Sequence, residues 1–169
     1  MILNTILIFT MEFMSSYYKE QYEFVKESRE VLFGFCKKIS EEDFVNQNSS
    51  FGRGGSIRNL LVHVANTYEY WIANLALNKN IIYAEYENFK NIQDVIILFN
   101  TIDDFMFKFI SELDYFDNGI SYKIKNINHS TKPLRLFSHV ITHEYHHKGQ
   151  ILSLARHLEY IPVDTDIMR

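Results

Sequence analysis

Residues 133–158 read PLRLFSHVITHEYHHKGQILSLARHL, and this stretch predicts a long amphipathic helix. Its apolar residues recur at intervals of three and four, which is typical of one helical face packed on a core. They are Leu136, Phe137, Val140, Ile141, Ile151, Leu154 and Leu158. Pro133 can open the helix because proline fits the first turn, and Pro162 limits its far end.

Three more helices are expected upstream, over residues 15–38, 56–77 and 91–113. Ser56 is a good N-cap for the second of them. The chain has only six glycines and two prolines, which favours long helices over a sheet with many turns. The alternating stretch ISYKIKNI, residues 120–127, predicts a short hairpin or an extended arm. We therefore predict an all-α four-helix bundle, with at most a short strand or hairpin between helices three and four.

The chain of 169 residues suits one domain, which we assign to residues 15–169. Residues 1–14 are an N-terminal extension or the first turns of helix one. Their apolar stretch is shorter than the ~20 residues that span a bilayer. It lacks the basic region and the small-residue cleavage site of a signal peptide. Met11 and Met14 are candidate translation starts beside Met1.

Composition excludes several classes of partner and compartment. The net charge is −4 and no basic stripe is present, so we expect no nucleic-acid partner and no membrane association. A single cysteine, Cys36, cannot form an internal disulfide, and we expect it to be buried in a cytoplasmic protein. The glycine-rich segment 46–55 lacks the phosphate-loop pattern and is expected to be a linker.

Histidines give the clearest functional signal. His139, His143 and His147 follow one another at intervals of four on one face of the last helix, and Gln150 continues that face. One buried imidazole is usually satisfied by a hydrogen bond, but three in register favour metal binding. Because a metal ion needs three or four ligands, a facing helix must contribute another, and His63 on the second helix is the obvious supplier.

Such a site has definite chemistry. Three neutral imidazoles leave the ion its full charge and an open coordination position, as in catalytic sites. Imidazole ligation suits Zn, Ni, Cu or Fe and does not choose among them. Tyr70 and Trp71, beyond His63 on the second helix, are candidates for lining a pocket, although aromatic residues there are more often core.

An H-E-x-x-H zinc protease is a remote alternative, because HEYHH at 143–147 has that spacing. Gln150 stands where the longer protease pattern has glycine, and the tail after His147 is short, with only Asp166 as an imaginable third ligand. Glu144 lies about a quarter-turn round the helix from His143, so it need not face the metal. We expect Glu144 to be a surface carboxylate or one that supports the ligands.

Two segments carry a family resemblance. SIRNLLVHVANTYEYWI at 56–72 and the stretch 133–158 resemble the DinB-like (DinB/YfiT) superfamily, and its H-x-x-x-H-[KR]-G-Q ending is the most specific piece. The segment order fits nearly the whole chain after residue 15. The resemblance implies a four-helix bundle with the metal ligands His63, His143 and His147. It places His146 outside the ligand set and His139 beside it.

The same resemblance implies a range of functions. Family members with known activity resemble bacillithiol S-transferases and mycothiol-dependent maleylpyruvate isomerases. The expected cofactor is a divalent metal, Zn or Ni first and Fe or Mn next, with a low-molecular-weight thiol as cosubstrate. The expected partners are a small-molecule substrate and a second copy in a homodimer. Two function classes stay open: a metal-dependent enzyme of thiol S-transferase or hydrolase-like type, and a metal- or small-ligand-binding module without catalysis.

Overall fold

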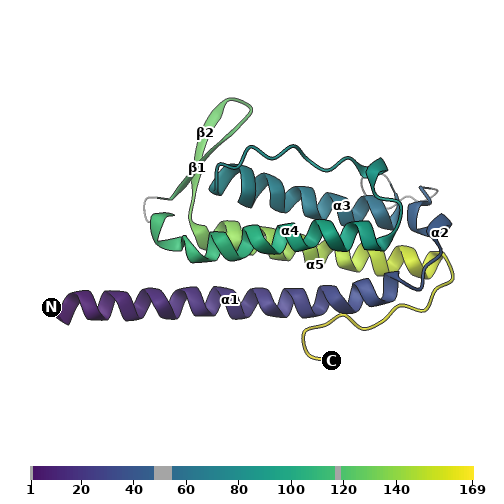
Figure 1. Ribbon diagram of the computed structural model, residues 1–169, viewed down its shortest axis with the longest axis horizontal. Helices are drawn as coiled ribbons and strands as arrows, with labels where there is room; N and C mark the ends of the chain where they lie inside the picture. The colour runs from purple at the N-terminus through teal and green to yellow at the C-terminus, as the bar shows by residue number, and fades with distance from the viewer. Residues whose placement is uncertain (1, 48–54, 117–118) are drawn as a thin grey trace.

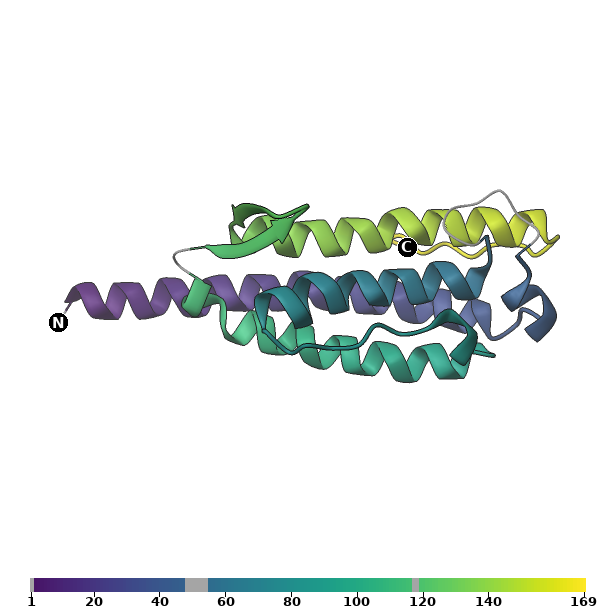
Figure 2. The same cartoon turned by 90° about the horizontal axis from the view of Figure 1, so that it is seen from above.

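Four long helices lie side by side in the computed structural model, which describes residues 2–47, 55–116 and 119–169 (Figure 1). They are α1 (Ile2–Cys36), α3 (Ile57–Tyr68) with its continuation η1 (Glu69–Ala76), α4 (Ile92–Ser111) and α5 (Pro133–His157). The N-terminal end of α1 extends past the other helices in both views (Figures 1 and 2). The predicted four-helix architecture is confirmed. Most of the expected linker 46–55 falls outside the described residues.

Short elements connect these helices: α2 (Glu41–Val45), η2 (Tyr86–Asn88), η3 (Leu113–Phe116) and a hairpin of β1 (Ile120–Ile124) and β2 (Ile127–Thr131). The hairpin runs from the Ile120–Thr131 pair to the Ile124–Ile127 pair. Its two-residue turn has positive φ at both positions, 48° at Lys125 and 65° at Asn126. Asparagine tolerates this conformation and lysine rarely adopts it, so the turn gave a weak hairpin signal in the sequence.

Helix starts follow local capping chemistry. The Ser56 side chain accepts a hydrogen bond from the Asn59 backbone N–H, as its N-cap role predicts. Asn91 and Asp94 form a reciprocal capping box at the start of α4. Pro133 occupies the first turn of α5, as expected. In the part of the chain that the structure describes, no helix has both the length and the apolarity needed to cross a membrane.

The second helix departs from the regular period that its sequence suggested. From Glu69 to Ala76 it is a π-helix, and the Leu77 N–H donates to the Ile72 carbonyl five residues back. A π segment shifts the side chains after it around the helix, so the 3.6-residue stripe no longer describes which residues are buried. Ile72 and Ala73 are fully buried, whereas Tyr70 and Trp71 are only half-buried.

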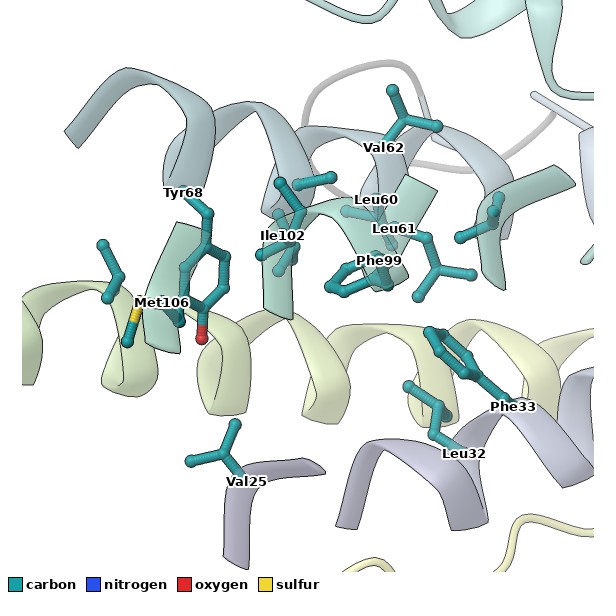
Figure 3. Close-up of a cluster of buried hydrophobic side chains, with 14 of the residues drawn as sticks. Val25, Leu32, Phe33, Leu60, Leu61, Val62, Tyr68, Phe99, Ile102 and Met106 are labelled. Carbon is teal, nitrogen blue, oxygen red and sulfur yellow. The ribbon is translucent and has the colours of Figure 1, made fainter. Parts of the chain in front are cut away.

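Apolar side chains from all four long helices fill the core. The close-up in Figure 3 shows residues of α1, α3 and α4 pointing toward one another, among them Val25, Leu60 and Phe99. Cys36 belongs to the same buried cluster, as its sequence context predicted. Burying such side chains contributes on the order of 2 kcal/mol each to folding.

A buried polar network crosses this core. The Arg29 guanidinium donates to Glu144 Oε1 at 2.9 Å and to Asp103 Oδ1 at 2.6 Å. The hydroxyl of Tyr68 donates to Glu144 Oε2 at 2.7 Å, and that of Tyr22 donates to Asp103 Oδ1 at 2.7 Å. These contacts join α1, α3, α4 and α5. The expectation that Glu144 is a surface carboxylate is therefore wrong, because its side chain is buried and paired.

We predict that Glu144→Gln lowers the free energy of unfolding by about 3 kcal/mol, because it leaves a buried guanidinium short of negative charge. Urea denaturation measures this change. Glu112→Gln is the control, since Glu112 pairs with Lys108 on the exposed side of α4 and should cost less than about 1 kcal/mol. Equal costs for the two variants would contradict the importance of the buried network.

Candidate metal centre

Three histidines meet between α3 and α5, which pack directly against each other. His63 comes from α3, and His143 and His147 come from successive turns of α5. One nitrogen from each ring lies within 4.8 Å of the other two. The ring centroids are 5.1 Å apart for His63 and His143, 4.8 Å for His63 and His147, and 4.4 Å for His143 and His147. The three residues assigned from the sequence therefore form one cluster.

The nitrogen geometry fits a shared ion. The Nε2 atoms of His63 and His143 are 3.2 Å apart. Two nitrogens that each lie about 2.0–2.1 Å from a tetrahedral zinc ion are roughly 3.3 Å apart. Three imidazoles are a donor set that suits Zn, Ni or Fe. The residues present thus fit the divalent metal that the sequence predicted.

Burial keeps the rings of His143 and His147 neutral. It lowers the pKa of His143 to about 4, with repulsion from the neighbouring imidazoles as a further cause. Burial also lowers the pKa of His147. Both rings are then unprotonated at neutral pH, which is the form that binds a metal.

Gln150 fixes the orientation of His147. The distance from His147 Nδ1 to Gln150 Oε1 is 2.7 Å. An amide oxygen only accepts, so Nδ1 carries the proton and Nε2 keeps its lone pair for an ion. The Gln150 amide nitrogen lies 3.1 Å from His146 Nε2, and His146 itself is exposed and outside the cluster. Gln150 therefore supports a ligand, in line with its place on the histidine face.

Thr67 and His139 flank the cluster. The Thr67 hydroxyl donates to the His63 carbonyl at 2.9 Å and lies 3.1 Å from His143 Nε2. Sequence reasoning missed Thr67, although its place four residues after His63 puts it on the same helical face. His139 is exposed, with its ring 6.0 Å from that of His143 and 5.1 Å from that of Trp71. It lies beside the cluster and outside it.

A cavity of about 450 Å³ opens next to His63. Its lining is aromatic and neutral: His63, Asn66, Thr67, Tyr70, Trp71, Tyr83 and Tyr86. Both pocket candidates from the sequence, Tyr70 and Trp71, are part of it. The far wall comes from the segment after η1, which Asn66 holds through two hydrogen bonds to the backbone of Ala84, at 2.9 and 3.1 Å. No periodic signal marked Tyr83 or Tyr86, because they lie in an irregular connection.

Glu144 is directed away from the histidines and into the core. Its carboxylate is bound by Arg29 and Tyr68, so it cannot serve as the general base that an H-E-x-x-H protease requires. The same spacing here positions two histidines toward α3 and the intervening carboxylate toward α1.

This protein is a four-helix bundle with three histidines between two facing helices. Helical bundles that bind a metal ion hold it in this way, between side chains of facing helices. The family comparison agrees with this description. The model of the DinB family matches residues 14–169, and the chain belongs to that family. No curated protein matches the chain.

We predict that His63→Ala or His147→Ala abolishes stoichiometric binding of a divalent metal, since each removes one of three ligands. Gln150→Leu should weaken binding by about 10–100-fold, because it frees the ring of His147. Metal analysis and competition with a chelator measure both effects. His146→Ala, next to His147 but exposed, is the matched control. Loss of metal in His146→Ala with retention in His147→Ala would place the site elsewhere.

Proposed function

We propose that this DinB family protein is a divalent-metal-dependent enzyme of the thiol S-transferase type. In this reaction a low-molecular-weight thiol adds to a small electrophilic substrate. The observation that carries the proposal is the three-imidazole cluster beside a cavity of about 450 Å³ with aromatic walls. Pockets of this size and lining suit small organic molecules.

A divalent ion bound by His63, His143 and His147 would favour a thiolate over the thiol, and so supply a nucleophile near neutral pH. Zn and Ni are the first choices for the ion, with Fe and Mn next. Imidazole ligands are neutral when they bind a metal, so they leave the positive charge of the ion uncompensated. The site thereby attracts an anionic sulfur.

The rest of the cavity would bind the substrate. Tyr70, Trp71, Tyr83 and Tyr86 offer ring faces for its apolar part, and Thr67 and Asn66 offer polar groups close to the cluster. Among the described residues that line this cavity there is no carboxylate and no amine. A reaction that needs no side-chain base is therefore favoured.

Intrinsic acidity favours a thiol over water as the nucleophile. A free thiol has a pKa of about 8.5, whereas water has a pKa of about 15.7 in bulk and ionises near neutral pH only when a metal such as zinc binds it. The neutral lining of the cavity also favours the second candidate, a metal- and ligand-binding module without turnover. Metal-dependent hydrolysis is the third candidate function, after thiol transfer and ligand binding without turnover.

The nucleophilic thiol must come from outside the protein. Cys36 is 1% exposed, and burial raises its pKa to about 12. A thiol with such a pKa is almost entirely protonated and unreactive at neutral pH. The cosubstrate is then a small thiol that diffuses into the cavity.

We predict that the metal-loaded protein conjugates 1-chloro-2,4-dinitrobenzene to an added thiol. The sulfur–carbon bond forms as the carbon–chlorine bond breaks, chloride leaves with the electron pair, and the thiol proton passes to water. Bacillithiol, glutathione and a reaction without thiol should be compared by absorbance. The rate above background should disappear in His63→Ala and persist in Cys36→Ser.

Other outcomes separate the alternatives. Turnover that needs no thiol would favour hydrolysis. Two negative results together would rule out the transferase hypothesis. They are no turnover with a broad set of thiols and electrophiles, and no change in the visible spectrum of the cobalt-substituted protein on adding any thiol. A binding module then takes its place.

A further inference from the structure

A second cavity, of about 410 Å³, lies between the hairpin and the start of α5. Its lining combines aromatic rings, imidazoles, hydroxyl groups and one guanidinium: Trp71, Tyr122, His129, Ser130, Thr131, Arg135, Leu136 and His139. We call it the hairpin cavity. None of the three histidines of the metal centre lines it.

Trp71 connects the hairpin cavity with the metal centre, because it lines both cavities. Its ring contacts Tyr122 of β1 at 5.4 Å between centroids and His139 of α5 at 5.1 Å. His139 also lines the hairpin cavity, so the wall of this cavity lies 6.0 Å, between ring centroids, from the ligand candidate His143.

The hairpin cavity is suited to an anion. Arg135 is its permanent cation, and within the described ranges no carboxylate lies close enough to the guanidinium to form an ion pair. The described lining contains two imidazoles and no acidic side chain. By contrast, Arg29 in the core is fully paired with Glu144 and Asp103.

The planar geometry of the Arg135 guanidinium also favours a carboxylate. A guanidinium presents a planar set of N–H donors that matches a carboxylate in two parallel hydrogen bonds. Tyr122 and His129, stacked at 5.2 Å on paired positions of the two strands, form an aromatic wall beside it. Such a site suits a short carbon chain that ends in a carboxylate.

We propose that the hairpin cavity binds the carboxylate end of the thiol cosubstrate, with Arg135 as its ion-pair partner, while the sulfur lies at the histidine cluster. This inference rests on the proposed function for the identity of the ligand. It assigns the substrate class more closely: the preferred thiols carry a carboxylate, and neutral thiols bind without the contribution of Arg135.

Trp71 provides the readout, because it is the only tryptophan in the chain and forms a wall of the hairpin cavity. Its fluorescence is titrated with mercaptosuccinate, which has a thiol and two carboxylates, with succinate, which has no thiol, and with neutral 2-mercaptoethanol. Zinc-loaded and metal-free proteins are both used. We expect Arg135→Gln to weaken the binding of mercaptosuccinate and of succinate by roughly tenfold or more. The affinity for 2-mercaptoethanol should not change.

Two control variants sharpen the measurement. Arg135→Lys keeps the charge but cannot form two parallel hydrogen bonds to a carboxylate. Its affinity for mercaptosuccinate should therefore fall between those of the parent and Arg135→Gln. Arg156→Gln removes an exposed arginine at the other end of α5 and should change nothing. Circular dichroism checks that each variant keeps its helices.

The outcomes separate this inference from the proposed function. Equal affinity of the parent and Arg135→Gln for mercaptosuccinate, or no binding of succinate to the metal-free parent, overturns the carboxylate site and leaves the transferase proposal intact. Arginine-dependent binding of succinate with no effect of any thiol on the metal-loaded protein overturns the thiol assignment, and with it the part of the proposed function on which the inference rests.

Discussion

The buried ion pair between Arg29 and Glu144 is the contact on which the rest of the structure depends. It joins α1 to α5, and the hydrogen bonds of Tyr68 and Asp103 extend it to α3 and α4. A buried charge is tolerated only when it is paired and hydrogen-bonded, and this packing of the four helices satisfies these groups together. A packing that broke the pair would leave a buried charge unpaired, which costs about 3–5 kcal/mol.

The same pair sets the rotation of α5. Successive residues in an α-helix are about 100° apart, so directing Glu144 toward Arg29 turns His143 and His147 together toward α3. There they meet His63, and the Nε2 atoms of His63 and His143 come to 3.2 Å. A carboxylate in the core thus positions the histidine cluster without contacting it.

The π segment of the second helix makes the second decisive contribution. It begins one residue after Tyr68, whose hydroxyl is bound to Glu144, and it carries Tyr70 and Trp71. With the wider helical turn these two rings are half-buried, and they line the cavity next to His63. Trp71 also lines the hairpin cavity. The space for ligands on both sides of Trp71 results from a departure from regular helix geometry.

By itself the sequence determined the helices, the hairpin region and, through the family resemblance, the three histidines. The helices and the pairing of two histidines depend on short-range physics: a 3.6-residue period, Ser56 and Pro133 at helix starts, and an i, i+4 spacing that places two imidazoles on one face. Tertiary structure alone decided the burial of Glu144, whose partner Arg29 lies 115 residues away. It also decided the π segment, the walls supplied by Tyr83 and Tyr86, and the approach of the hairpin to Arg135. Each of these depends on contacts between segments distant in the chain, and such contacts leave no periodic or local signal in the sequence.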